Sequence, residues 1–286
     1  MSYRKTYIIA ELSANHGQKL ENAIETVRAA KLAGADAIKI QTYTADTITL
    51  DCDNEYFQIN QGTLWDGTTL YKLYQEAFTP WEWHRAIQAE AQKIGLDFFS
   101  TPFDFSAVDF LYDLNVPMYK IASFEINDIP LIKYVAKKRK PIIISTGIAD
   151  LSMIEEAVAA CREVGNNDIT LLKCTSSYPA DPADANLLTI PNMKNTFNVK
   201  VGLSDHTMGG SVAIAAVALG AEVIEKHFII DRKIGGPDAS FSMEPKDFKE
   251  MVDSIRLVEK ALGEVNYAAD ESVLRSRKFS RSLFVS

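Results

Sequence analysis

Residues 199–228 read VKVGLSDHTMGGSVAIAAVALGAEVIEKHF, and this stretch contains one strand–helix–strand unit. Two short apolar runs, residues 199–205 and 221–228, flank an alanine-rich segment that ends at Gly220. Such runs are typical of strands buried on both faces of a parallel sheet, and a glycine after a helical segment is typical of a helix C-terminus. The stretch therefore predicts two parallel strands joined by a helix.

The same unit recurs along the whole chain. Six further apolar runs resemble buried strands, and they cover residues 7–12, 36–43, 96–100, 117–123, 140–147 and 168–176. Segments with helical spacing that end in glycine lie between the runs, among them residues 21–34, 80–95 and 152–165. Eight strands that alternate with helices predict an α/β fold, a closed (β/α)8 TIM barrel, with a doubly wound open sheet as the alternative.

Domain boundaries follow from where this alternation ends. We expect one barrel domain over residues 1–265 and a C-terminal tail over residues 266–286 that has no evident fold of its own. One connection, residues 44–80, is long and carries Trp65, Tyr71 and Tyr74, which makes it too aromatic for a disordered linker. Long loops of a barrel usually serve its active site.

Composition and charge exclude several classes of protein. Of the 286 residues, 47% are hydrophobic and 24% are charged, and the formal net charge is −8. Such an acidic chain is not expected to bind nucleic acid or an anionic membrane, so any phosphate site must be local. The three cysteines are too scattered for a disulfide framework, and the short N-terminal apolar run is soon interrupted by Glu11, unlike a signal peptide. These features predict a cytoplasmic protein.

Polar residues stand at the C-terminal end of nearly every predicted strand. In a TIM barrel the active site is assembled at this end, so all of them are candidates for it. They are Glu11, Asn15 and His16; Lys39, Gln41 and Thr42; Ser100 and Thr101; Lys120, Ser123 and Glu125; Ser145 and Thr146; Lys173, Thr175, Ser176 and Tyr178; Ser204, Asp205 and His206; and Glu225, Lys226 and His227.

Lys39 and Lys120 lie on non-adjacent predicted strands and have serine and threonine hydroxyls nearby. Two ammonium groups and several hydroxyls could clamp a phosphate by charge and hydrogen bonds, which predicts a small phosphorylated substrate. The alternative is that each lysine forms a structural ion pair at the mouth of the barrel.

His206 and His227 follow the seventh and eighth predicted strands, which are neighbours in a closed barrel. Their imidazoles could meet on one divalent metal ion, with water or substrate oxygens as its other ligands. Such an ion would act as a Lewis acid that polarises a carbonyl group. The alternative is that each histidine is a hydrogen-bonded core residue.

Three carboxylates, Glu11, Glu125 and Asp238, are predicted to face the same mouth. They could serve as a general base or as acceptors for substrate hydroxyls, and the residues alone do not say which does which. Other candidates are interpreted as loop caps, packing or rim residues and core residues, and these are Asp66, Asp104, His84 and Cys174.

Several strings of residues, in consistent order and spacing, resemble the sialic acid (nonulosonic acid) synthase family. They cover nearly the whole chain and read IAELSANHG, IKIQTYTADTITL, FSTPFD, YKIASFEIND, STGIA, LLKCTSSYP, VGLSDHTMG, VIEKHF and GPDASFS. The resemblance implies a TIM barrel that joins phosphoenolpyruvate to an open-chain amino sugar. C3 of phosphoenolpyruvate attacks the sugar aldehyde, water adds to the resulting oxocarbenium carbon, and phosphate leaves by C–O cleavage.

The resemblance also implies a role for each site residue. Phosphoenolpyruvate would be held by Lys39, Thr101, Lys120, Ser123, Ser145 and Ser204. A divalent cofactor would be held by His206 and His227, with Mn2+ expected and Mg2+ or Co2+ as alternatives. The residues expected to be catalytic are Glu125, which would handle the water, Lys120 and Glu11. The remaining substrate contacts are assigned to Gln41, Ser176, Tyr178 and Asp238.

Within the family, residues 62–84, GTLWDGTTLYKLYQEAFTPWEWH, look more like pseudaminic acid synthases than N-acetylneuraminate synthases, as do residues 9–17 and 120–128. The implied sugar is a 2,4-diacetamido-2,4,6-trideoxy-L-altrose, and an N-acetylneuraminate or legionaminic acid synthase is the alternative. The aromatic residues of this loop could cover the apolar surface of such a sugar, or they could only pin the loop.

The end of the sequence departs from the family. Members usually continue past a segment like RSLFVS, residues 281–286, into an antifreeze-like domain, which we expect to be absent from this chain. In the family that domain reaches across a homodimer to the partner's sugar site, so the resemblance also implies a homodimer.

Two other classes of function stay open on the sequence. A Schiff-base aldolase would place a lysine such as Lys120 or Lys226 at a strand end and would need no metal. A non-catalytic barrel that binds a sugar is the second, and the full set of lysines, histidines and carboxylates argues against it.

Overall fold

The computed structural model of the chain describes residues 5–60 and 62–280. Eight parallel strands form a closed barrel in the order of the sequence, and the last strand pairs with the first. The predicted TIM barrel is confirmed, and the open-sheet alternative is wrong. The strands are β1 (Tyr7–Glu11), β2 (Ala37–Thr42), β3 (Asp97–Pro102), β4 (Tyr119–Ile121), β5 (Ile142–Ser145), β6 (Ile169–Cys174), β7 (Lys200–Asp205) and β8 (Val223–His227).

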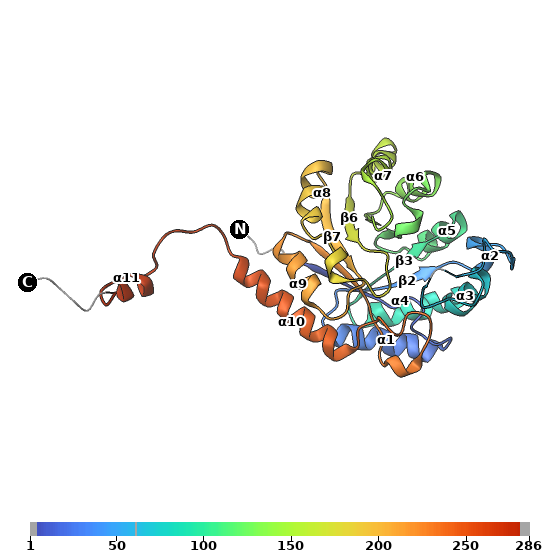
Figure 1. The fold of residues 1–286 in the computed structure, drawn as a ribbon, viewed down its shortest axis with the longest axis horizontal. Helices are drawn as coiled ribbons and strands as arrows, with labels where there is room; N and C mark the ends of the chain where they lie inside the picture. Colours follow the sequence, from blue (N-terminus) through green and yellow to red (C-terminus); the bar gives the residue numbers. More distant parts are fainter. Residues whose placement is uncertain (1–4, 61, 281–286) are drawn as a thin grey trace, which may run out of the picture.

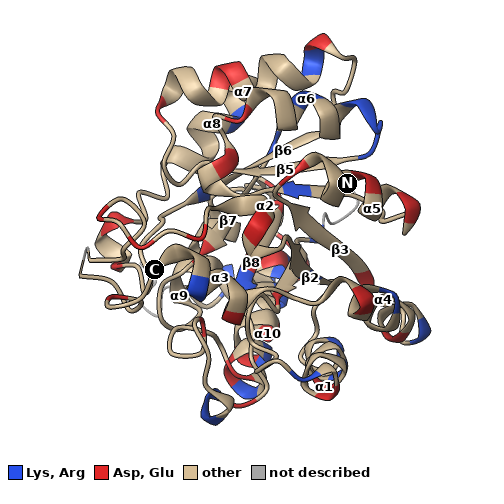
Figure 2. Ribbon diagram, turned by 90° about the vertical axis from the view of Figure 1, so that its right-hand side faces the viewer, with Lys and Arg blue, Asp and Glu red and all other residues tan. Residues whose placement is uncertain are grey.

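Helices cover the outside of the barrel (Figure 1). The four segments with helical spacing that end in glycine form helices, and they are α1, α4, α7 and α9. Basic and acidic positions are interspersed on the outer helices (Figure 2). The helices are α1 (Leu20–Leu32), α2 (Ala45–Ile48), α3 (Leu70–Ala77), α4 (His84–Lys93), α5 (Phe105–Asp113), α6 (Ile129–Lys137), α7 (Leu151–Glu163), α8 (Thr189–Phe197), α9 (Ser211–Ala218), α10 (Pro245–Leu262) and α11 (Glu271–Arg277).

Aliphatic strand residues fill the core, as the apolar runs predicted. Ile8, Ile38, Ile121 and Ile144 are fully buried between the strands and the surrounding helices. Burial of each such side chain contributes about 1.5–3 kcal/mol relative to exposure. At Gly202 in β7 the strands approach so closely that a Cβ would lie 2.3 Å from the carbonyl oxygen of Val223 in β8. Only glycine fits there without separating the two strands.

The fourth strand is shorter than expected. The apolar run predicted a strand over residues 117–123, whereas β4 ends at Ile121 and residues Ser123–Glu125 form a single 3-10 turn, η2. The turn is stabilised by backbone hydrogen bonds from Glu125 N to Ala122 O, 3.2 Å, and from Asp128 N to Glu125 O, 3.0 Å. It brings Ser123 and Glu125 to the rim of the barrel instead of continuing the strand.

The long connection between β2 and β3 is built from α2, α3 and the short 3-10 helix η1 (Trp81–Trp83). Its residue Trp65 donates a hydrogen bond from Nε1 to the carbonyl oxygen of Pro237, 3.0 Å away in the segment after β8. The β2–β3 connection therefore extends past β1 to the segment that follows β8. Asp66 caps this loop by accepting from Thr63 N, as predicted, and Asp104 caps α5 by accepting from Ala107 N.

The C-terminal part leaves the barrel after α10, which packs against α1 and α9 (Figure 1). The short helix α11 lies away from the barrel, and its residues are exposed. The RSLFVS segment, residues 281–286, lies outside the described residues. Among the described residues, no helix combines the length and the apolar character needed to cross a membrane.

His84 is a structural residue inside the wall of the barrel. It is fully buried, its Nε2 lies 2.8 Å from Thr42 Oγ1, and its ring contacts Phe98 and Phe110 edge-on. Burial lowers the pKa of His84 to about 4. The interpretation as a packing residue is confirmed.

Because the His84 imidazole is buried in its neutral form, we expect the folded chain to lose stability in acid. The unfolded chain binds a proton at His84 below about pH 6.5, whereas the folded chain does not until about pH 4, so the free energy of unfolding falls as the pH drops between these values. Urea denaturation at pH 7.5 and 5.0 should show that His84→Gln is less stable than the wild type at the higher pH. The gap should narrow by about 2 kcal/mol at the lower pH. A constant gap would mean that His84 is not held neutral by burial.

Candidate active site

Four buried charged side chains form a network at the mouth of the barrel. Lys39 Nζ lies 2.5 Å from Glu11 Oε2 and 3.8 Å from Glu225 Oε2. Lys120 Nζ lies 3.5 Å from Glu225 Oε1, so Glu225 bridges the two lysines. The two lysines do converge, as the sequence predicted. The ion pairs of the alternative interpretation are present as well, because each ammonium group has a carboxylate partner.

Burial governs the charge of this network. It raises the pKa of Glu11 to about 7, although Lys39 opposes the shift, and it lowers the pKa of Lys120. For Lys39, burial is outweighed by the charges of Glu11 and Glu225, which raise its pKa. Near neutral pH Glu11 is therefore partly protonated while Lys39 stays charged. Protonation of Glu11 makes the network less negative, which favours an anionic ligand.

Hydroxyl groups surround the two lysines. Lys39 Nζ donates to Thr101 Oγ1 at 3.2 Å, and Lys120 Nζ donates to Ser145 Oγ at 2.7 Å. On the other side, Ser204 Oγ donates to Glu225 Oε1 at 3.0 Å. Ammonium groups combined with hydroxyls are well suited to phosphate oxygens.

Gly147 allows two further serines to approach this cluster. Its N–H donates to Ser123 Oγ at 3.0 Å, and a Cβ at this position would lie 2.1 Å from Ser176 Oγ and 2.7 Å from Ser123 Oγ. A glycine at the end of β5 therefore leaves room for both hydroxyls. Without it, the serines on the β4 and β6 loops would have to move apart.

The two histidines lie side by side, with ring centroids 5.4 Å apart. His206 Nδ1 donates to the carbonyl oxygen of Thr175 at 2.9 Å, so in the neutral ring the lone pair is on Nε2. Burial, together with the nearby positive charges, lowers the pKa of His227 well below its usual range. The ring of His227 is therefore neutral, the form that binds metal ions. Burial opposes the charged form of His206 as well, but its contacts with Cys174 and with the carbonyl oxygen of Thr175 outweigh burial and raise its pKa, so a metal ion would have to displace a proton there.

These residues fit a divalent cation. His227 Nδ1 is buried without a hydrogen-bond partner, and an orphaned buried nitrogen indicates a missing ligand. Over residues 5–60 and 62–280, no group of three or more His, Cys, Asp and Glu side chains is arranged to hold a metal ion. The chain would thus supply two imidazole ligands and leave the other positions to water or substrate oxygens.

Two more carboxylates face the mouth. Glu125 Oε2 is buried without a hydrogen-bond partner, and burial raises the pKa of Glu125 to about 7. Asp238 Oδ2 accepts a hydrogen bond from Ala14 N at 3.4 Å and lies 3.7 Å from His227 Nδ1, and burial raises its pKa. Gln41 Nε2, the remaining polar candidate on β2, donates to Glu11 Oε1 at 3.2 Å.

An aromatic wall lines the outer part of the mouth, and we use this term for Tyr178, Trp65 and Phe241. The ring centroid of Tyr178 lies 4.4 Å from that of His206, 5.6 Å from Trp65 and 5.2 Å from Phe241. These side chains come from three different connections, and they meet directly beside the histidine pair.

Some strand-end residues do not belong to this mouth. Lys226 alternates with Glu225 and His227 along β8 and therefore points to the outer side of the barrel wall. Thr42 and Ser100 hydrogen-bond to each other inside the wall at 2.6 Å. Cys174 is buried as predicted, but it does belong to the mouth, because it pairs in register with Ser204 and its Sγ lies 3.8 Å from His206 Nδ1.

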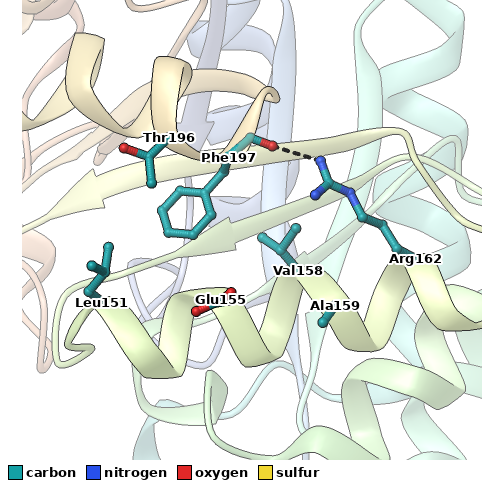
Figure 3. Close-up of a pocket in the computed structure, with 7 residues that line it drawn as sticks. All are labelled: Leu151, Glu155, Val158, Ala159, Arg162, Thr196 and Phe197. Carbon is teal, nitrogen blue, oxygen red and sulfur yellow. Dashed lines mark hydrogen bonds between the residues drawn. The ribbon is translucent and has the colours of Figure 1, made fainter.

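A separate cavity of about 400 Å³ lies on the outside of the barrel between α7 and α8 (Figure 3). It is lined mainly by aliphatic and aromatic side chains, and at one end Arg162 donates a hydrogen bond to the carbonyl oxygen of Phe197, 2.7 Å away. None of its lining residues belongs to the charged network or the histidine pair.

Comparison with known proteins identifies the family. Residues 26–267 match the family model described as NeuB family. The chain belongs to the NeuB family. The NeuB chain is 50% identical over 283 residues to the pseudaminic acid synthase of Campylobacter jejuni, a match that covers 99% of this chain and 82% of the relative. It is also 50% identical over 279 residues to the pseudaminic acid synthase of Helicobacter pylori, covering 97% and 82% of the two chains.

A solved structure supports the fold of this NeuB chain. The crystal structure of N-acetylneuraminic acid (sialic acid) synthetase from Leptospira borgpetersenii superimposes with a TM-score of 0.84 at 33% identity. The match covers 98% of this chain and 92% of that one. The family and the barrel that the residue strings implied are both confirmed.

Sequence reasoning gave Glu225 no role of its own. Its carboxylate contacts both Lys39 and Lys120, yet in the sequence it is one of many polar residues at strand ends. The signal that could have found it is its spacing of two residues from His227, because residues two apart on a strand face the same side.

Proposed function

We propose that this chain is a pseudaminic acid synthase, which condenses phosphoenolpyruvate with 2,4-diacetamido-2,4,6-trideoxy-L-altrose to give pseudaminic acid and phosphate. The observation that carries the proposal is the 50% identity to the Campylobacter pseudaminic acid synthase over 99% of this chain. Buried lysines, hydroxyls and a histidine pair at the end of the barrel where TIM-barrel enzymes act support the same reaction.

The charged network would hold phosphoenolpyruvate. Lys39 and Lys120 neutralise its phosphate and carboxylate groups, and hydroxyls donate to the remaining oxygens. A ligand of this charge favours the protonated form of Glu11, because burial already brings the pKa of Glu11 to about 7. The full set of phosphoenolpyruvate ligands is Lys39, Thr101, Lys120, Ser123, Ser145 and Ser204.

The sugar would lie above this network, with its aldehyde at the histidine pair. His206 and His227 would hold Mn2+, with Mg2+ or Co2+ as alternatives. When bound there, the ion supplies Lewis-acid polarisation of the aldehyde oxygen. The aromatic wall packs against the C6 methyl and acetamido groups, and polar contacts to the sugar come from Gln41, Ser176, Tyr178 and Asp238.

The reaction then needs a group that handles water. C3 of phosphoenolpyruvate forms the new bond to the aldehyde carbon, which leaves C2 electron-poor. Water adds to C2 as Glu125 takes one of its protons, and the oxygen of the former aldehyde takes up one proton to become a hydroxyl. The C2–O bond to phosphate then breaks, and phosphate leaves with the electron pair and with the remaining proton of the added water as C2 becomes a ketone carbonyl. A carboxylate with a pKa of about 7 is well matched to accepting and returning a proton near neutral pH.

The unit that performs this reaction would be the barrel, residues 1–265. We place residues 266–286 outside it, as a tail leading away from the catalytic unit, since α11 lies away from the barrel. We further propose that the enzyme acts as a homodimer in the cytoplasm.

The test is phosphate release from phosphoenolpyruvate in the presence of Mn2+. Turnover is expected with the diacetamido-trideoxy-altrose and not with N-acetylmannosamine or without sugar. Preference for N-acetylmannosamine would reassign the chain to N-acetylneuraminate synthesis, and preference for the legionaminic acid precursor would reassign it to legionaminic acid synthesis. Inactivation by borohydride with pyruvate, without a metal requirement, would instead indicate a Schiff-base aldolase. Sugar binding without any turnover would favour a non-catalytic barrel.

A further inference from the structure

A buried ion pair lies behind the two histidines, on the outer side of the barrel wall. Strand register places Asp205 of β7 beside Lys226 of β8, and Lys226 Nζ lies 2.7 Å from Asp205 Oδ2. The two side chains are 1% and 2% exposed. Asp205 immediately precedes His206, and Lys226 immediately precedes His227. The pair therefore connects the two strand ends that carry the histidines.

The contacts of this pair enclose His206 on both sides. Lys226 Nζ also donates to the carbonyl oxygen of Thr207 at 2.6 Å. Asp205 Oδ1 accepts hydrogen bonds from Thr207 N at 2.9 Å and from Thr207 Oγ1 at 2.8 Å. The ammonium group of Lys226 thus contacts the residues on either side of His206 in the sequence, Asp205 and Thr207. Lys226 is itself bonded through the backbone to His227.

Stability alone is a poor explanation for this arrangement. Removing two charges from water costs several kcal/mol per ion, so a buried ion pair is often no more stable than apolar residues of the same volume. What it does provide is a short and directional connection between fixed atoms. Residues that orient metal ligands from behind commonly change metal affinity by about 10- to 100-fold when they are replaced.

We propose that Lys226 and Asp205 are positioning residues that fix the spacing of His206 and His227 for one shared divalent cation. Neither side chain faces the mouth, so neither is placed to touch the substrate. The proposal rests on the metal site of the proposed function. The proposal assigns a role to Lys226 and Asp205, which lie on the outer side of the barrel wall and take no part in the reaction steps described above.

The test variant is the double substitution Lys226→Met with Asp205→Asn. It leaves the net charge unchanged, and the asparagine oxygen can still accept from Thr207, so only the ammonium connection is lost. The matched control is Lys200→Met with Asp168→Asn. It removes an ion pair of the same residue types, 2.8 Å apart, at the opposite end of β7. Mn2+ affinity is measured on the metal-free proteins from the electron paramagnetic resonance signal of free Mn2+. Thermal unfolding and phosphoenolpyruvate binding are recorded in parallel.

The expected result is a Kd for Mn2+ that is about 10- to 100-fold weaker in the double variant, with phosphoenolpyruvate binding unchanged and the control equal to the wild type. A Kd within twofold of the wild type would overturn the proposal. So would a joint loss of Mn2+ binding, phosphoenolpyruvate binding and thermal stability, because the pair would then serve folding only. Failure of the wild type itself to bind Mn2+ would contradict the metal site, and that result is distinct from both.

Discussion

Lys120→Met is expected to lower kcat/KM for phosphoenolpyruvate by about 1,000-fold. The ammonium group of Lys120 lies within the charged network, 2.7 Å from Ser145 Oγ and 3.5 Å from Glu225 Oε1. Methionine fills a similar volume but cannot neutralise the anion that we propose to bind there. It also leaves Glu225 with the more distant Lys39 as its lysine partner, so that an incoming phosphate meets a less compensated carboxylate.

Steady-state kinetics and calorimetric titration with phosphoenolpyruvate provide the measurement. The control is Lys140→Met, because Lys140 stands before β5 at the opposite end of the barrel and donates to the carbonyl oxygen of Val116. This control should keep wild-type affinity. If Lys120→Met lost less than tenfold in kcat/KM, the two lysines would be structural ion pairs, as the alternative interpretation of the sequence holds.

Glu125→Gln is expected to lower kcat by about 100- to 10,000-fold, while binding of phosphoenolpyruvate and Mn2+ is retained. Glu125 must be ionised to accept a proton from water, and burial raises its pKa to about 7. The kcat of the wild type should therefore rise with pH through about 7 and level off above it. The residual activity of the glutamine variant should lack this dependence, because the titrating group is gone.

A pH profile of kcat between pH 5.5 and 9 for both proteins measures the effect. Glu155→Gln, an exposed carboxylate on α7 beside the outer cavity, is the control and should retain the wild-type profile. A profile in the Glu125→Gln variant that still rises through pH 7 would assign the titration to another group. Glu11 would be the first candidate, because burial also raises its pKa to about 7.

The sequence predicted the barrel because a strand buried on both faces needs a continuous apolar run, and eight such runs are visible without any structure. It also predicted which end carries the site. Lys39 and Lys120 could be paired for the same reason, since strand ends in a barrel converge.

Direction along a strand was harder to predict. Lys120 and Lys226 look equivalent in the sequence, yet one faces the mouth and the other faces the outer wall. A shift of one residue in register reverses the two faces, and the apolar runs of a doubly buried strand do not fix that register. The role of Glu225 was missed for the same reason. The contact between Trp65 and Pro237 joins residues 172 positions apart, so it cannot be predicted from a local sequence pattern.

The pairing of β1 with β8 also determines when the barrel can close during synthesis of the chain. Glu11 is on the first strand to leave the ribosome, whereas Glu225 and His227 are on the last strand of the barrel. At roughly 5–20 residues per second, β1 waits roughly 10–40 s for its partner and exposes an unpaired edge during that time. Charged and polar residues near the end of β1 would limit association between such half-made chains. The first and last strands must meet before any nascent chain can assemble the complete charged network.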